Sequence, residues 1–170
     1  ILQRHQTHIH KILKFRYYKK MTTKTKKKQK KALIEGPITP QFIADAIAKH
    51  SAKTDIGAHN IFMGQVRNDI IDRKQVKAIE YAAYKEMAEE EFYKIRESAF
   101  EKYNIICMHI YHSLGVVKAG EISMFVFVSS KHRDESYKAS RYVVEEIKSK
   151  VPIFGKEIFE DDTHVWKERT

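Results

Sequence analysis

A nearly continuous apolar segment, residues 122–128, most restricts the folds open to this 170-residue chain. Ser123 is the only polar residue in the segment. A strand with one face in water alternates apolar and polar residues, so an almost unbroken apolar strand must be covered on both faces. The segment is far too short to cross a bilayer, which takes about 20 residues as a helix. We therefore expect a buried strand inside a layered domain, and no membrane partner.

The periodicity of the remaining sequence predicts an α+β fold. Apolar residues from Ala88 to Ala99 recur at intervals of four, three and four, which is typical of a helix that packs through one face. The order of elements favours helices packed on a mainly antiparallel sheet, with short strands at the end of the chain. The expected helices are residues 40–50, 85–103 and 134–151; the expected main strands are residues 59–66, 76–84, 105–112 and 121–129, with a loop at 68–74 and a turn at 117–120.

Three expectations about helix faces follow from the same spacing. Met87 is expected in the core, and the three glutamates at 89–91 are expected on a solvated face. The last helix is expected to bury one stripe of side chains, which contains Tyr137, Ser140, Val144 and Ile147 and ends at Val151. Pro152 then ends this helix, because proline disfavours helical geometry in the residue before it.

The positive charge of the chain is concentrated at its start. Residues 1–31 hold twelve of the 32 basic residues and none of the 22 acidic ones, which leaves residues 32–170 with a net charge of −2. We expect residues 1–31 to form a basic, disordered tail and residues 32–170 to form the domain. Met21 is a candidate start, with residues 1–20 as upstream sequence. Nucleic-acid binding is not expected of the domain, and only the tail could support it.

Histidine and cysteine usage gives no expectation of a metal site. Cys107 is the only cysteine, which fits a reducing compartment such as the cytoplasm, and its apolar neighbours predict a buried small side chain. His109 and His112 are three apart, so in a strand they point to opposite faces and should not share a metal. No residue set in the sequence requires a metal or an organic cofactor.

Polar groups gather at the ends of apolar elements in three places, where ligand sites tend to form. In residues 62–68, Gly64 lets another chain or ligand approach the backbone, and Arg67 follows the strand; the alternative is a bulge with a solvated arginine. In residues 129–134, His132 and Arg133 precede a helix and favour anion binding. The alternative there is a polar loop in which Asp134 caps the helix.

The third place is residues 148–157. Lys148 lies one position from the apolar stripe at Ile147, so its ammonium can be partly desolvated at the edge of the buried face. Desolvation lowers the pKa of a lysine toward values useful in acid, base or nucleophilic chemistry. The alternative is a surface lysine whose stem covers apolar area while its charge stays in water.

These motifs, in this order, resemble the large, catalytic subunit of molybdopterin synthase over about residues 33–168. Each motif alone is weak, but the ordered set is specific. The matching motifs are Gly64-Gln65-Val66-Arg67-Asn68, His112-Ser113-Leu114-Gly115, the residues from Ser129 through Arg133, those from Lys148 through Glu157, and Trp166-Lys167.

The resemblance implies an α/β hammerhead fold and a sulfurtransferase of molybdenum cofactor biosynthesis. It implies a homodimer of large subunits with a small ubiquitin-like sulfur-carrier subunit at each end, and therefore a heterotetramer. The C-terminal thiocarboxylate of the small subunit would deliver two sulfurs to cyclic pyranopterin monophosphate, which yields molybdopterin. No metal or cofactor is implied for the large subunit itself.

The resemblance also carries roles to individual positions. Lys148 matches the catalytic lysine of the family, while Arg67, His132 and Arg133 match residues of the substrate pocket. Phe62 is expected to form an apolar wall. The family places a second functional lysine where this chain has Gly155, so the neighbouring Lys156 is a weaker catalytic candidate.

Two other functions remain open on this evidence. The change at Gly155 leaves room for a non-catalytic paralogue or scaffold that binds a ubiquitin-like tail. The basic residues at the start leave room for a nucleic-acid-binding protein whose binding would fall with salt.

Overall fold

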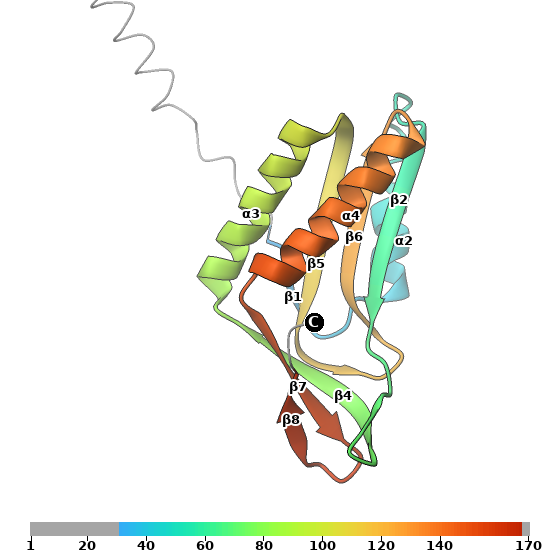
Figure 1. Ribbon diagram of the computed structural model, residues 1–170. Coiled ribbons are helices and arrows are strands. Elements are labelled where there is room, and N and C mark those ends of the chain that lie inside the picture. The colour runs from blue at the N-terminus through green and yellow to red at the C-terminus, as the bar shows by residue number, and fades with distance from the viewer. Residues whose placement is uncertain (1–30, 168–170) are drawn as a thin grey trace, which may run out of the picture. The chain divides into compact units, whose positions relative to one another are not determined.

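The computed structural model describes residues 31–167, so the expectations about a disordered tail and a start at Met21 lie outside the described residues. Within this range, helices separate groups of one to three consecutive strands (Figure 1). The elements are β1 (Leu33–Glu35), α2 (Pro40–Ala48), β2 (Ala58–Gln65), β3 (Ile70–Ile71), β4 (Lys74–Ala83), α3 (Lys85–Lys102), β5 (Ile105–Lys118), β6 (Ile122–Ser130), α4 (Arg133–Lys150), β7 (Ile153–Phe159) and β8 (His164–Trp166).

The strands form one sheet in the order β2-β6-β5-β4-β7-β8, with β1 added to β5 and β3 to β4. Only the β1–β5 pair is parallel, so the expected α+β class with a mainly antiparallel sheet is confirmed. Two local predictions were wrong. Residues 68–74 contain the short strand β3, and β5 continues to Lys118, which moves the turn toward residues 119–121.

Strand β5 joins two parts of the sheet. Its first half pairs with β6, and its end, from Gly115 to Lys118, pairs with β4. Gly115 has a φ of 74°, a left-handed conformation that glycine adopts without steric cost. The strand changes partner at this glycine, and β4, β7 and β8 extend beyond the part of the sheet that the helices cover (Figure 1).

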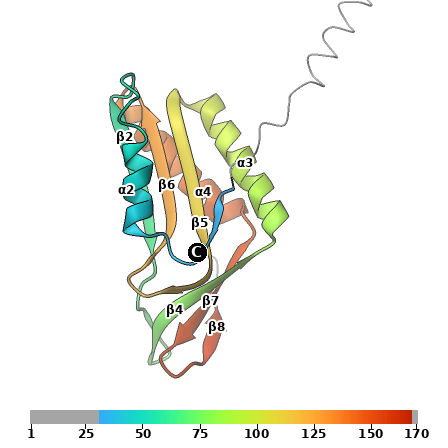
Figure 2. The same cartoon turned by 180° about the vertical axis from the view of Figure 1, so that it is seen from behind.

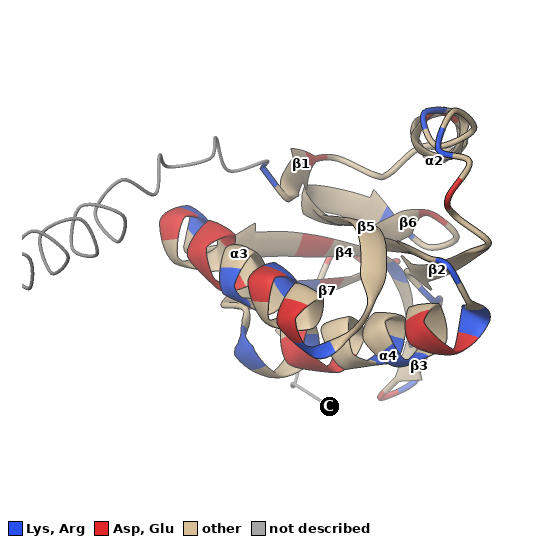
Figure 3. Cartoon of the chain, turned by 90° about the horizontal axis from the view of Figure 1, so that it is seen from above, with Lys and Arg blue, Asp and Glu red and all other residues tan. Residues whose placement is uncertain are grey.

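Strand β6 is covered on both faces, as its apolar sequence predicts. Met124, Val126 and Val128 belong to the core under α3 and α4. Phe125 and Phe127 point the other way, into a smaller cluster under α2. The view from behind and the view from above show α2 alone on this second face (Figures 2 and 3).

The helix faces follow the predictions only in part. The apolar residues of α3 from Ala88 to Ala99 are buried, but Met87 is 60% exposed because it lies one position before this stripe. In α4 the buried face holds Ser140, Val144 and Ile147 but not Tyr137, which is 57% exposed. Small side chains at Ser136, Ala139 and Ser140 face the core instead.

Acidic and basic residues are interspersed along α3 and α4 (Figure 3). Lys94 of α3 pairs with Glu90 and Glu91, an arrangement that stabilises exposed helices only slightly. Glu89 was expected to be solvated, but its carboxylate accepts hydrogen bonds from the backbone amides of Ala32 and Leu33 at 2.9–3.1 Å. No helix within residues 31–167 has the length and apolar character needed to cross a membrane.

Candidate active site

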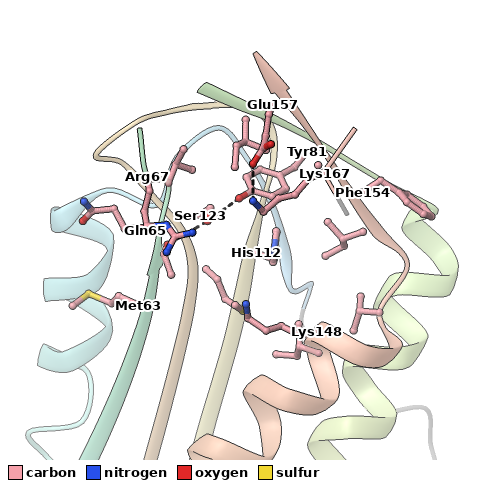
Figure 4. Close-up of a pocket in the computed structure, with 18 of the residues that line it drawn as sticks. Met63, Gln65, Arg67, Tyr81, His112, Ser123, Lys148, Phe154, Glu157 and Lys167 are labelled. Atoms are coloured by element: carbon pink, nitrogen blue, oxygen red, sulfur yellow. Dashed lines mark hydrogen bonds and ion pairs between the residues drawn. The ribbon is translucent and has the colours of Figure 1, made fainter. Parts of the chain in front are cut away.

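A cavity of about 560 Å³ opens where the end of α4 meets β2, β6 and the β4–β7 pair (Figure 4). Its size lies within the range common for small-molecule sites, about 300–1,000 Å³. Side chains from five strands and one helix converge there. They include Phe62, Arg67, Tyr81, His112, Ser123, Lys148, Glu157 and Lys167.

Lys148 lies in the last turn of α4 and lines this cavity. Its side chain and that of Arg67 enter from different walls, α4 and the residues after β2 (Figure 4). Lys148 is exposed, so the partial desolvation expected of it is not present in the single chain. No acidic group among residues 31–167 pairs with it, which leaves its ammonium available for a ligand.

His112 is a buried residue that lines the same cavity. It belongs to one of the matching sequence motifs, but no role was predicted for it. Burial, and then the positive charge of Lys148, lower the pKa of His112, although a hydrogen bond to the carbonyl of Ser113 at 2.9 Å opposes this shift. The carbonyl can only accept, so Nδ1 carries the proton in the neutral ring and Nε2 keeps a lone pair. The ring packs edge-on against Tyr81 at a centroid distance of 5.0 Å.

Tyr81 forms the polar floor of the cavity with Ser123. The Tyr81 hydroxyl donates to Ser123 Oγ at 3.3 Å, and Ser123 donates to the carbonyl of Gly64 at 3.2 Å. Burial raises the pKa of Tyr81, so the phenol stays protonated and can act as a hydrogen-bond donor. A side chain at Gly64 would crowd Met124, since its Cβ would lie 3.2 Å from that of Met124.

Arg67 and Phe62 lie where the sequence predicted them, in the cavity wall. Arg67 pairs with Asp69 at 2.8 Å, and its side chain is largely exposed. An exposed ion pair contributes little free energy, about 0–1 kcal/mol, so the guanidinium can exchange Asp69 for an anionic ligand at small cost.

Strand alternation separates Lys156 from the cavity. Gly155 and Glu157 face the cavity, whereas Lys156 does not line it and instead pairs with Glu80 of the neighbouring strand. The second ammonium in the cavity belongs to Lys167, which follows β8. Its backbone donates to the carbonyl of Gly155 at 2.8 Å, and its Cβ would lie 3.6 Å from a Cβ at that glycine.

Lys167 also forms an ion pair with Glu157 at 2.6 Å, in which the carboxylate side chain is 5% exposed and the lysine 39%. Neither residue has a role that is predicted from the sequence. In a strand, alternate residues point to opposite faces, so Gly155 and Glu157 share one face and Lys156 lies on the other. This alternation is visible in the sequence and predicts that Lys156 cannot replace a side chain at position 155.

His132 and Arg133 lie at the other end of α4. His132 is the N-cap and Lys148 is sixteen residues later, which separates them by about 24 Å, since each helical residue advances about 1.5 Å. Neither residue lines the cavity of its own chain. Asp134 is not the cap; it pairs with Lys138 at 2.6 Å. One chain therefore brings together Phe62, Arg67 and Lys148, but not Lys156, His132 or Arg133.

Comparison with known proteins identifies the family. The sequence model described as MoaE protein matches residues 33–150. This chain belongs to the MoaE protein family. A molybdopterin synthase catalytic subunit of Pyrococcus abyssi is 37% identical to this chain over 142 residues. These residues are 83% of this chain and 93% of the Pyrococcus protein. The rat protein of the same description is 40% identical over 111 residues, 65% of this chain and 55% of its own length.

Solved structures share the MoaE fold. Molybdopterin synthase from Staphylococcus aureus, 31% identical, superposes with a TM-score of 0.71 and covers 81% of this chain and 96% of its own. A chain from the complex of subunits 1 and 2 of the Helicobacter pylori molybdopterin-converting factor, 22% identical, gives a TM-score of 0.69 over 81% of this chain and 90% of its own. The resemblance drawn from the sequence motifs is thereby confirmed.

Proposed function

We propose that this MoaE chain is the catalytic subunit of a molybdopterin synthase, a sulfurtransferase that converts cyclic pyranopterin monophosphate to molybdopterin. The observation that carries the proposal is the Lys148 ammonium, which has no acidic partner within residues 31–167 and lies in a cavity that also holds Arg67 and Lys167. The names of the Pyrococcus and rat relatives support the activity. A reducing cytoplasm suits the reaction, because both the sulfur donor and Cys107 are then kept reduced.

The charges in the cavity suit an anionic substrate. Arg67, Lys148 and Lys167 supply three cations, and the two acidic groups beside them, Asp69 and Glu157, are already paired. Arginine and lysine bind phosphate through charge-assisted hydrogen bonds. Phe62 and the Tyr81 ring offer apolar surface to the pterin, and the Tyr81 hydroxyl offers a donor.

Lys148 serves as the proton donor in each sulfur transfer. The thiocarboxylate sulfur forms a bond to a side-chain carbon of the pterin precursor while a carbon–oxygen bond breaks. The ammonium gives its proton to the leaving oxygen and stabilises the charge that develops there. Water then cleaves the resulting thioester, which leaves the new thiol on the pterin and the carboxylate on the carrier.

Lys167 supplies the second ammonium that Gly155 cannot. Its main chain is hydrogen-bonded to residue 155, and Glu157 holds its side chain in the cavity. In this assignment Lys156 has no direct part in the chemistry, because its partner is Glu80 outside the cavity.

The partner is a small ubiquitin-like sulfur-carrier subunit, in line with the two-subunit complex of the Helicobacter pylori factor. The large subunit also forms a homodimer. His132 and Arg133 can contribute to a substrate pocket only if that pocket belongs to another chain, because α4 separates them from the Lys148 of their own chain by its full length. A dimer that places one α4 beside the cavity of the other chain meets this condition.

The test is conversion of the purified pterin precursor by the full chain together with a thiocarboxylated small subunit. Molybdopterin should form, and none should form with a small subunit that ends in an ordinary carboxylate. If the chain binds the small subunit tightly but gives no product, it is a scaffold and the proposed function is wrong.

A further inference from the structure

Three possible metal ligands meet on the face of the sheet opposite α3 and α4. Nε2 of His50 lies 3.1 Å from Sγ of Cys107, which lies 3.2 Å from Nε2 of His109, and the two nitrogens are 3.2 Å apart. His50 is buried and the other two are half-buried. Cys107 is thus neither fully buried nor surrounded only by apolar groups, as its sequence neighbours had suggested.

We propose that His50, Cys107 and His109 bind a divalent cation of the zinc class. Zinc takes nitrogen at about 2.0–2.1 Å and thiolate at about 2.3 Å in tetrahedral geometry, which sets its ligand atoms about 3.3–3.6 Å apart. The three observed separations fall 0.1–0.5 Å short of these values, so small side-chain adjustments admit the ion. Mixed imidazole and thiolate ligands favour zinc over magnesium or calcium.

The surroundings of His50 are those of a metal ligand. Its Nδ1–H donates to the carbonyl of Ala46 at 2.7 Å, which directs the Nε2 lone pair toward Cys107 and His109. Such a second-sphere hydrogen bond is nearly always found on histidines that hold metals. The Phe127 ring packs against both imidazoles, with centroid distances of 4.7 Å to His50 and 6.0 Å to His109.

Hydrogen bonds account for at most two of the three contacts between these ligand atoms. With both rings neutral, His50 has its proton on Nδ1, so the thiol and His109 supply at most two protons for three short contacts. One metal ion satisfies all three ligand atoms, and the thiol proton passes to solvent when it binds. Three protein ligands leave a fourth position for water.

The ion would also fasten α2 to the sheet. His50 follows the C-terminal end of α2, a helix without a fully buried residue, whereas Cys107 and His109 belong to β5. The site is independent of the proposed sulfur transfer, because the cavity lies on the other face, to which His112 points.

Cobalt(II) titration of the full, metal-free chain tests the proposal. Cys107 is the only cysteine, so a thiolate-to-cobalt charge-transfer band in the near ultraviolet reports this site and no other. We expect one Co²⁺ per chain to give this band together with intense visible bands of tetrahedral cobalt. His50→Gln and His109→Gln should each weaken the apparent affinity by about 10-fold or more.

Cys107→Ser should abolish the charge-transfer band, whereas His164→Gln, at an exposed histidine of β8, should leave it unchanged. Zinc should raise the melting temperature of the wild type but not that of Cys107→Ser, because only a ligand of the folded state stabilises it. A missing band at excess Co²⁺ would overturn the proposal. So would a band of unchanged affinity in both histidine variants, since it would reflect adventitious binding to a thiol alone.

Discussion

The two ends of α4 carry cationic residues in different settings. At the C-terminal end, Lys148 lines a cavity with aromatic and polar walls. At the N-terminal end, His132 and Arg133 are exposed, and the hydroxyls of Ser130 and Ser136 donate to the backbone carbonyls of these two residues. Lys148, His132 and Arg133 of a single chain therefore cannot meet in one pocket. The helix fixes the distance between its two ends, so these residues can share a pocket only if they come from different chains of an assembly.

Replacing Lys148 should give the largest effect. Lys148→Ala should lower the rate of molybdopterin formation by about 100-fold or more, the usual contribution of a positioned proton donor. The circular dichroism spectrum should stay unchanged, because the side chain is exposed. Lys150→Ala is the matched control, since Lys150 lies in the same helical turn but pairs with Glu146. Equal losses in both variants would remove the special status of Lys148.

Mixing two impaired variants tests whether the N-terminal end of α4 contributes to the pocket of another chain. We expect Arg133→Ala to lower the rate about 10-fold, in line with the loss of a charge-assisted hydrogen bond. Random pairing of Arg133→Ala with Lys148→Ala chains should restore about a quarter of the wild-type rate, because each mixed dimer regains one of two pockets.

The control for this experiment is the double variant, in which every chain carries both Arg133→Ala and Lys148→Ala. It has no intact pocket in any pairing and should stay inactive. If the mixture of single variants is no more active than the average of its parts, Arg133 does not act across the dimer.

Lys167 should matter less than Lys148 but more than Lys156. Lys167→Gln keeps a hydrogen-bond donor beside Glu157 and removes the charge, so we expect a fall of about 5–10-fold in kcat/KM with little loss of fold. Lys156→Gln should change the rate less than about twofold, because Lys156 pairs with Glu80 and does not line the cavity. If Lys156→Gln lowered kcat/KM more than Lys167→Gln, Lys156 and not Lys167 would be the second catalytic lysine.

The smallest expected effect is a change in the pKa of His112. Among the cationic residues at the two ends of α4, only Lys148 shifts this pKa. The pKa of His112 is lowered by burial and by Lys148, so Lys148→Ala should raise the pKa measured by NMR, whereas Arg133→Ala should not move it. A histidine with a lowered folded-state pKa binds more protons when unfolded. The free energy of unfolding should therefore fall as pH drops below about 6.5, and His112→Asn should lessen that fall.

Much of the fold could be predicted because local pattern and burial agree. The apolar run of β6 required cover on two faces, and the spacing from Ala88 to Ala99 located the buried stripe of α3. Tyr137 and Met87 escaped prediction because each lies one position from a buried stripe, and spacing alone cannot fix the edge of a helix face.

The site was predictable where one element supplied it and unpredictable where the fold brought elements together. Phe62 and Arg67 belong to or follow β2 and reach the cavity as expected. Lys167 lies beside residue 155 only because β7 pairs with β8, and no local sequence pattern predicts that pairing. The contact of His50 with Cys107 spans 57 residues and likewise depends on how α2 crosses the sheet.

The pairing of β1 with β5 and of β2 with β6 has a consequence for synthesis of the chain. Neither early strand has a sheet partner before residue 105, so the first third of the domain leaves the ribosome without a structure to join. Long-range pairing slows folding, and unpaired strands expose surfaces that aggregate. The nascent chain therefore passes through a vulnerable interval that ends only when β5 and β6 have emerged, and a pause in translation before them would lengthen it.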